Sequence, residues 1–263
     1  MLKIRLYFLM FVLSFFSFKN IGNESIFNFK VDYFDVDILG NLYLVRESEL
    51  VKYDAALERQ STFSDLSLGE ITSIDASDAM NLLVYYEDFG SIIFLDNTLS
   101  IKKSAISLAD LGFSITSLAC LSYNNAFWIF DPVNQELIRI NQFLEITERS
   151  GNLNQIINTE IEPDQLFEAG NNVYLKDRKE GVFIFDRYAG YLKRLPFLAI
   201  DDLQFIEPNN LAFLRSDTLF TYNMNTINMD TMTLLQKGVK KIMVNSDSYF
   251  YLGKKGMVYR ESI

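Results

Sequence analysis

The stretch "GNLYLVRESELVKYDAALER" (residues 40–59) contains a pattern that returns along the chain. Its first part, "NLYLV" at Asn41, has five related copies that begin at Asn81, Asn125, Asn172, Asn210 and Ser248. The spacings between successive copies are 40, 44, 47, 38 and 38 residues. Asn and Gly favour tight turns, so the Asn that recurs at the start of all copies but the last predicts a turn that leads into a strand. The regular period indicates a repeat architecture.

In each copy a second apolar run starts about ten residues after the first, and a second recurring position lies at the end of that run. The large apolar residue at this position is Tyr53, Leu95, Ile140, Phe185, Tyr222 or Tyr259. The next residue is Asp54, Asp96, Asn141, Asp186 or Asn223 in the first five copies, and Arg260 in the last. An Asp or Asn after an apolar run predicts a strand that ends in an Asx turn. A Leu or Ile then recurs at Leu57, Leu99, Leu144, Leu192 and Ile227, and it is predicted to open the next strand.

Each unit therefore contains four short apolar runs, rich in β-branched and aromatic residues and bounded by turn residues. Helical repeats have a similar period, but they need long segments with apolar residues at i, i+3, i+4 and i+7, which the chain lacks. The fold class predicted is all-β: a six-bladed β-propeller with four-stranded antiparallel blades. The last unit stops at its third strand. We expect "SIFNFKV" (residues 25–31) to close the ring as the outermost strand of that blade.

The repeat resembles those of known propeller families. "GNLYLVRESELVKYD" is similar to the NHL-type repeat of six-bladed propellers, and "LVYYED" (residues 83–88) resembles the YWTD repeat. The resemblance covers nearly all of residues 23–263, which are predicted to form a single domain, and it implies a fold rather than an activity.

Residues 1–22 are predicted to be a signal peptide. A basic start with Lys3 and Arg5 precedes an apolar run at residues 6–18, which is shorter than a membrane-spanning helix and is typical of a leader. The protein is then exported to the periplasm or cell envelope, with no integral membrane span after leader removal. The alternative is that the run forms an apolar first strand of the domain.

Composition excludes several classes of function. Net charge is −10, so nucleic-acid binding is not expected. The chain has no His, which removes the commonest general base and neutral metal ligand. The single Cys, Cys120, lies in an apolar stretch and is predicted to be a buried structural thiol. No cofactor and no metal site is implied.

The resemblance places the functional face at the loops between second and third strands and between blades. It implies candidate binding residues on the first kind of loop: Arg46, Glu87, Asp88, Asp131, Asp177 and Arg178. The alternative is a solvated rim whose Asp and Asn make turns. Two units also carry extra length, at residues 102–113 and 148–163. Because loops on a rigid scaffold often carry binding sites, Leu108, Leu111 and Phe113 of the first insertion are further candidates.

Asp35, Asp37 and Asp75 form a separate group of carboxylates. They are interpreted as turn and rim charges, with a place along the central channel as the alternative. Trp128, the single Trp, is predicted to pack in a core strand.

The function predicted is a non-catalytic protein-binding scaffold or assembly component that docks another envelope protein on the loop-bearing face. Two alternatives stay open: a metal-dependent hydrolase of lactonase or glycosidase type with carboxylates at the channel, and a glycan-binding module.

Overall fold

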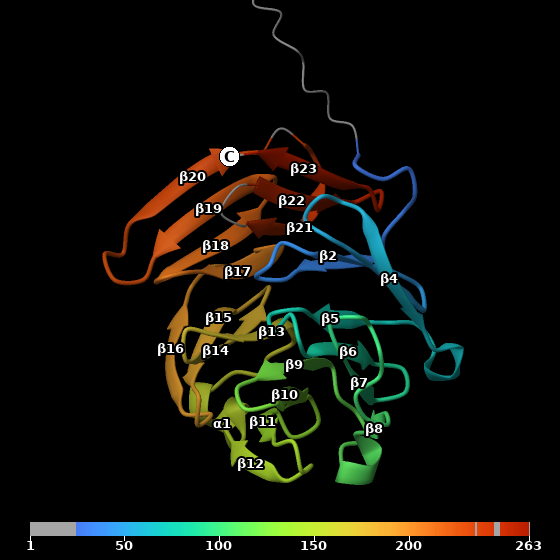
Figure 1. Ribbon diagram of the computed structural model, residues 1–263. Helices are drawn as coiled ribbons and strands as arrows, with labels where there is room; N and C mark the ends of the chain where they lie inside the picture. Colours follow the sequence, from blue (N-terminus) through green and yellow to red (C-terminus); the bar gives the residue numbers. More distant parts are fainter. Residues whose placement is uncertain (1–24, 235, 245–247, 263) are drawn as a thin grey trace, which may run out of the picture.

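The computed structural model describes residues 25–234, 236–244 and 248–262. Six antiparallel sheets follow one another around a common centre, as the predicted propeller requires (Figure 1). Five blades have four strands and the sixth has three, within the described residues.

The strands of the first three blades are as follows. Blade 1 contains β1 (Tyr33–Val36), β2 (Leu42–Arg46), β3 (Glu49–Tyr53) and β4 (Arg59–Ser64). Blade 2 contains β5 (Ser73–Asp75), β6 (Leu82–Tyr86), β7 (Ser91–Leu95) and β8 (Ile106–Ser107). Blade 3 contains β9 (Leu118–Ser122), β10 (Ala126–Asp131), β11 (Glu136–Ile140) and β12 (Ile146–Arg149).

The remaining blades complete the ring. Blade 4 contains β13 (Pro163–Ala169), β14 (Asn172–Asp177), β15 (Gly181–Asp186) and β16 (Tyr191–Leu195). Blade 5 contains β17 (Asp202–Ile206), β18 (Asn210–Arg215), β19 (Thr218–Asn223) and β20 (Met229–Thr233). Blade 6 contains β21 (Val239–Val244), β22 (Ser248–Gly253) and β23 (Val258–Ser262). Short helices lie between blades: η1 (Leu66–Leu68), η2 (Ala109–Leu111) and α1 (Leu153–Ile157).

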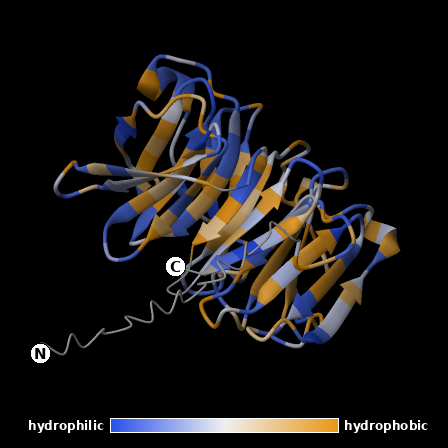
Figure 2. Cartoon of the chain, turned by 90° about the horizontal axis from the view of Figure 1, so that it is seen from above, coloured by the Kyte–Doolittle hydropathy of each residue, from blue (hydrophilic) through white to orange (hydrophobic). Residues whose placement is uncertain are grey.

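The core of the protein lies between blades. In the described residues, six apolar clusters each combine side chains of two neighbouring blades, and one of them joins blade 6 to blade 1. In that cluster Phe34 and Leu44 pack with Phe250 and Leu252. Figure 2 shows hydrophobic residues along the strands, interspersed with hydrophilic ones. Burial of these side chains on both faces of each blade closes the ring.

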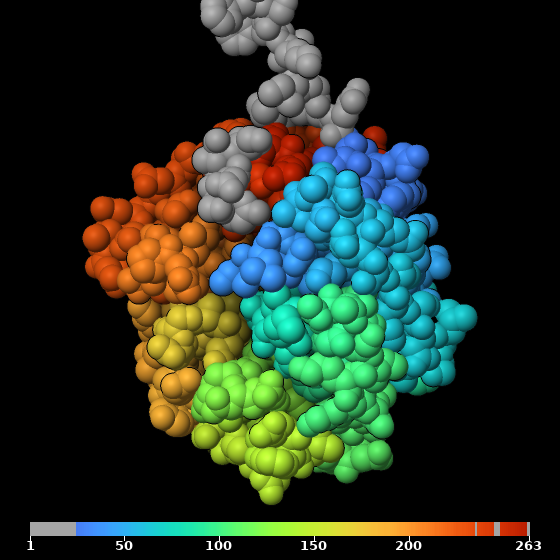
Figure 3. All heavy atoms as spheres, viewed as in Figure 1, coloured from blue at the N-terminus to red at the C-terminus, as the bar shows by residue number. Residues whose placement is uncertain are grey.

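The closing segment differs in detail from the expectation. Residues 25–31 lie against blade 6 (Figure 3), where Ile26 N–H donates to Val258 O at 2.9 Å and Val31 N–H donates to Gly256 O at 2.7 Å. The segment bends and forms no strand, so blade 6 stays three-stranded. The reason is its apolar content: Phe27 and Phe29 turn into the cluster between blades 6 and 1, and side-chain packing replaces a ladder of hydrogen bonds.

The Asx turns after the third strands are confirmed. Asp96, for example, accepts hydrogen bonds at Oδ1 from the N–H groups of Thr98 at 2.8 Å and Ser100 at 2.9 Å. The recurring Leu or Ile does not open the next strand, however. It lies within the turn in the left-handed region at Leu57, Leu99, Leu144 and Ile227, with φ of 64°, 63°, 65° and 61°.

Burial explains one such turn residue. Leu99 is 4% exposed because its side chain enters the core between blades 1 and 2. Burial of a leucine side chain contributes about 1.5–3 kcal/mol, which offsets the cost of a left-handed backbone. Leu192 alone of the predicted set lies in a strand, β16.

Two sequence predictions concern the start of the chain and the membrane. The predicted signal peptide at residues 1–22 lies outside the described residues. None of the helices that the structure describes is long and apolar enough to cross a bilayer.

Candidate functional site

The candidate site is a pocket at the outer rim of the ring, between blades 2 and 3. It arises because β8 pairs with β7 at only two positions, Ile106 with Ile92 and Ser107 with Ser91. Before β8, a single bridge joins Ile101 to Leu95, and the chain then swings away from the blade. The outer strand therefore leaves part of β7 uncovered, and a cavity of about 470 Å³ lies between the blades.

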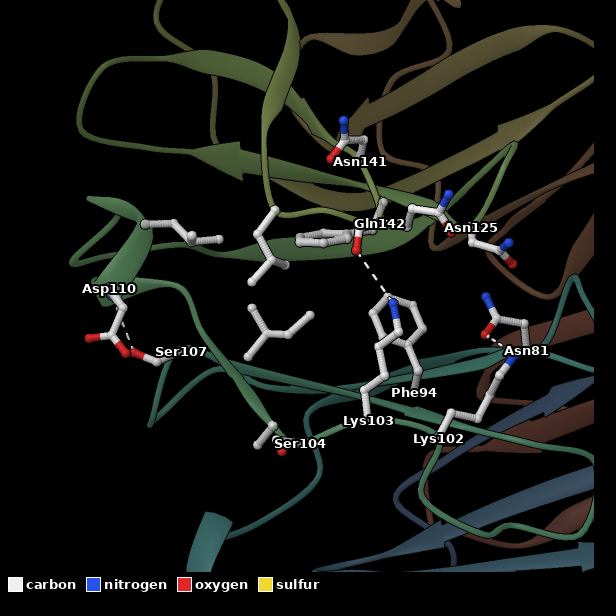
Figure 4. Close-up of a pocket in the computed structure, with 15 residues that line it drawn as sticks. Asn81, Phe94, Lys102, Lys103, Ser104, Ser107, Asp110, Asn125, Asn141 and Gln142 are labelled. Atoms are coloured by element: carbon white, nitrogen blue, oxygen red, sulfur yellow. Dashed lines mark hydrogen bonds between the residues drawn. The ribbon is translucent and has the colours of Figure 1, made fainter.

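The pocket has an apolar floor and a polar rim (Figure 4). Phe94 of β7 and Phe127 of β10 form the middle of the floor, with ring centroids 5.9 Å apart. Leu111 and Leu144 extend the apolar surface from blade 2 and blade 3 respectively. The polar lining consists of Asn81, Lys102, Lys103, Ser104, Ser107, Asp110, Asn125, Asn141 and Gln142. The lining therefore combines apolar side chains with groups that donate and accept hydrogen bonds, and both kinds occur in ligand pockets.

Two lysines make one end of the pocket cationic. Lys102 Nζ donates to Asn81 Oδ1 at 2.8 Å and to the carbonyl of Met80 at 3.2 Å, while Lys103 Nζ donates to the carbonyl of Gln142 at 3.4 Å. Neither lysine belongs to any of the salt bridges formed among the described residues. Asp110 lies at the opposite end, beside Ser107 (Figure 4). The pocket therefore carries positive charge at the end with Lys102 and Lys103 and negative charge at the end with Asp110.

The first insertion, residues 102–113, supplies one wall of the pocket, but its three predicted binding residues lie differently. Leu108 and Phe113 are 0% and 6% exposed and pack into the core between blades 2 and 3, so they do not form an exposed docking surface. Leu111 is half-buried and lines the pocket. The predicted helical turn in this insertion is present as η2, which ends at Gly112 with φ of 95°.

Four of the candidate residues on the second-to-third-strand turns are exposed. Arg46 lies 3.9 Å from Glu49 and stacks over Phe29 at 4.8 Å. Glu87 and Asp88 are adjacent, and partial burial together with the Asp88 charge raises the pKa of Glu87 above its usual range. Arg178 pairs with Asp201 at 2.7 Å.

The other two candidates on these turns are buried and shape the turns themselves. Asp131 is 4% exposed and accepts from Val133 N–H at 2.9 Å and from Asn134 Nδ2 at 2.8 Å. Asp177 is 2% exposed and accepts backbone N–H bonds from Glu162, Lys179 and Glu180. Both carboxylates therefore use their hydrogen-bonding capacity within the fold.

The carboxylates of the first strands also have structural partners. Asp35 accepts from Ala76 N–H at 2.9 Å, and Asp75 accepts from Leu121 N–H at 2.8 Å, in each case from the next blade. Asp37 accepts from Leu39 N–H and from Asn41 at the following turn. Burial raises the pKa of Asp35 to about 6, with Lys241 opposing the rise and Asp75 adding to it. Among the described residues, no group of three or more Cys, Asp or Glu side chains is arranged to hold a metal ion.

Two predictions about single residues are confirmed. Cys120 is a buried free thiol, and burial raises its pKa well above the usual range, so the reactive thiolate is disfavoured. Trp128 is fully buried in β10, where its Nε1 donates to Glu168 Oε2 at 2.6 Å.

Most of the pocket is not predictable from the sequence. Phe94 and Phe127 resemble any other apolar strand residue, and Gln142 resembles any other turn residue, so no local pattern indicates that they line a site. The one available signal was the adjacent pair Lys102 and Lys103 at the start of an insertion, in a chain with net charge −10.

Comparisons with known proteins identify the fold. No protein-family model matches the sequence, and no curated protein sequence is significantly similar to it. A virginiamycin B lyase structure from Staphylococcus aureus is similar with a TM-score of 0.62 at 10% identity, covering 88% of this chain and 79% of that one. The Neurospora crassa Pan2 WD40 domain gives 0.61 at 9% identity, covering 89% and 76%. BBS1N in complex with ARL6DN gives 0.57 at 14% identity, covering 84% and 74%. At such identities the likeness shows the propeller fold alone.

Proposed function

We propose that this chain is an exported, non-catalytic propeller that docks a partner protein of the cell envelope over the pocket between blades 2 and 3. The basic start and the apolar run at residues 6–18 support export. N-terminal sequencing of protein recovered from the envelope fraction tests this part: a mature start near residue 23 agrees with it, and an intact Met1 contradicts it.

The observation that carries the docking role is the pocket itself. Its floor comes from Phe94 and Phe127, which are held by paired strands of two blades, whereas one wall comes from the insertion that departs from the repeat. A floor held by paired strands suits recognition, because little order has to be created when the partner binds.

The lining groups also favour binding. They are apolar side chains, carboxamides, hydroxyls, two ammonium groups and the single carboxylate of Asp110. Such groups anchor an apolar side chain and orient polar atoms around it, as at the centre of a protein interface.

The similar structures support this role only at the level of fold. One of them is a propeller in complex with another protein, BBS1N with ARL6DN, while others are described as lyases. The same scaffold therefore serves more than one class of function, and the feature that favours docking in this chain is the pocket.

A pair of matched variants tests the docking role. Ala105 is exposed and lines the pocket, so Ala105→Trp fills it. Ala56 is exposed in the Asx turn that follows β3 of blade 1, outside the pocket lining, so Ala56→Trp is the control. Each protein is immobilised, incubated with envelope extract and compared with wild type by quantitative mass spectrometry.

We expect a defined protein that wild type and Ala56→Trp retain equally and that Ala105→Trp loses by at least about tenfold, which corresponds to about 1.4 kcal/mol. If the retained proteins are the same for all three, the pocket is not the docking site and the proposal is wrong. Thermal melting of both variants shows whether either substitution has altered the fold.

A further inference from the structure

We propose that the pocket between blades 2 and 3 captures the C-terminus of a partner polypeptide that ends in an apolar residue. The terminal carboxylate lies against Lys102 and Lys103, and the last side chain packs against Leu111 and Leu144 above the base formed by Phe94 and Phe127. This inference rests on the proposed docking role and names the chemistry of the segment that enters the pocket.

The cationic end of the pocket carries the choice of a carboxylate. An ammonium group has three donors, and the bonds described above use two on Lys102 and one long bond on Lys103. The neighbouring acid Asp96 forms no salt bridge with either lysine: its Oδ1 accepts from Thr98 and Ser100 within its own turn, and these bonds lower the pKa of Asp96 more than the charge of Lys102 does. Two lysines that form no salt bridge within the described residues, in a chain of net charge −10, leave a local site for an anion.

The floor determines what is attached to that carboxylate. Phe94 and Phe127 form the base of the pocket with only 8% and 1% of their surface exposed, so the apolar surface open to a ligand comes from half-buried Leu111 and from Leu144, which is 41% exposed. A small inorganic anion would leave this surface in water. An apolar side chain covers it, and burial contributes about 25 cal/mol for each Å² removed from water. The cavity of about 470 Å³ is within the size of pockets that hold a compact organic group.

Carboxamides on the rim favour a polypeptide over a simple acid. Asn81 is 5% exposed, and of its side-chain atoms only Oδ1 has a hydrogen-bond partner among the described residues, namely Lys102 Nζ. The side chains of Asn125 and Gln142 line the same pocket and have no hydrogen bond to any described residue. Carboxamides both donate and accept, so these three groups match the N–H and C=O groups of a peptide backbone.

Asp110 sets the direction in which the segment enters. Its carboxylate lies at the end of the pocket opposite the lysines (Figure 4). Like charges repel, so the carboxyl terminus is directed away from Asp110 and toward Lys102. The chain leading to the terminus therefore leaves the pocket on the Asp110 side.

Direct binding to defined probes tests the inference. The full chain is titrated into fluorescein-labelled pentapeptides of sequence Gly-Ser-Gly-Ser-X, where X is Phe, Leu or Asp with a free carboxylate. The same Phe and Leu peptides with a C-terminal amide form the second set, and octanoate is added as an unlabelled competitor. Anisotropy gives the Kd of each peptide. We expect the free Phe and Leu peptides to bind at least tenfold more tightly than their amides and than the Asp peptide.

Charge variants locate the carboxylate. The double variant K102M/K103M keeps the length and apolar stem of both side chains but removes both charges. We expect it to lose at least tenfold in affinity for the free-carboxylate peptides and to be unchanged toward the amides. The double variant K254M/K255M, which removes the charges of two adjacent exposed lysines outside the pocket lining, is the matched control and is expected to bind every peptide as wild type does. Because Lys102 also holds Asn81, K103M alone is measured too, and thermal melts accompany every variant.

Several outcomes would overturn the inference. They are equal affinity for acid and amide peptides, undiminished binding by K102M/K103M and K103M, or no peptide binding at millimolar concentration. Tight binding of octanoate without binding of any peptide would identify a small acid as the occupant and would also contradict the inference. The docking role is separable: if a partner is lost by Ala105→Trp but retained by K102M/K103M, only the carboxylate inference fails.

Discussion

The Oδ2 atom of Asp35, in the first strand of blade 1, accepts a 2.9 Å hydrogen bond from the backbone N–H of Ala76, which follows the first strand of blade 2. The relationship recurs around the ring. Asp75 accepts from Leu121, and Asp202 accepts from Ile242 at 2.8 Å. Side chains of one blade therefore satisfy backbone donors of the next, at places where the inner strands of adjacent blades are not paired by a ladder.

Asp35 makes stability depend on pH. Burial raises its pKa from 3.8 to about 6, with Lys241 opposing and Asp75 reinforcing the rise. The folded state thus holds this proton more tightly than the unfolded state. Its stabilising contribution is fully present below about pH 4 and is lost as pH rises through about 6, by on the order of 3 kcal/mol. We expect the free energy of unfolding of Asp35→Asn to fall less over this range than that of wild type, in urea titrations from about pH 4 to 7. Parallel pH profiles would contradict the assignment.

Gly256 is predicted to be essential to ring closure. It has φ of +78°, and a Cβ there would lie 3.0 Å from Val31 O, next to the bond between Val31 N–H and Gly256 O. Gly256→Ala is expected to cost about 2–3 kcal/mol, because the left-handed backbone costs about 1–2 kcal/mol and the closing segment must also shift. Gly90→Ala is the control, since Gly90 has φ of +53° and nothing within 4 Å of its added Cβ. Equal losses in urea unfolding would show that the segment does not resist the new methyl group.

Glu168 is predicted to stabilise the junction of blades 3 and 4. Its Oε2 accepts from Trp128 Nε1 at 2.6 Å and from Ser122 Oγ at 2.5 Å. Glu168→Ala leaves a buried indole N–H without an acceptor and is expected to destabilise the fold by about 1–3 kcal/mol. Glu168→Gln keeps an acceptor oxygen and should cost less. Trp128 is the single Trp of the chain, so its fluorescence follows unfolding of both variants. A larger loss for Gln than for Ala would disprove this role.

Cys120 is predicted to be unreactive in the folded protein. It is 1% exposed, and burial raises the pKa of its thiol, with smaller contributions from Asp75 and Glu168. Because the thiolate is the nucleophile, an aromatic disulfide reagent should label Cys120 only as fast as the fold opens. In urea the reaction should proceed at the rate of a free thiol. Rapid labelling in buffer alone would show that the junction of blades 3 and 4 opens easily.

Local patterns made the blades predictable from the sequence. Asn41 and its equivalents mark the entry to a strand, and Asp54 and its equivalents mark a turn, because these residue types favour particular backbone conformations wherever they stand. The six-bladed order follows from the number of repeats. The prediction that Leu99 opens the next strand was wrong. Leu99 lies in the turn with a left-handed backbone, and burial of its side chain offsets the cost of that conformation.

The candidate site depended on information that local patterns do not contain. Lys102 and Lys103 are visible in the sequence, but Phe127 joins them only because blade 3 packs against blade 2. Leu108 and Leu111 look alike as residues of one insertion, yet the first is buried in the core and the second lines the pocket. An irregular loop has no period from which the direction of a side chain can be read.

The sequence by itself thus determined the repeating strands, their turns and their number, since each follows from the conformational preferences of neighbouring residues and from alternating burial. Only the tertiary structure decided where β8 stops pairing with β7 and which residues of blades 2 and 3 line the pocket at that place. That outcome depends on the packing of two blades against each other, and packing joins residues that are distant in the chain.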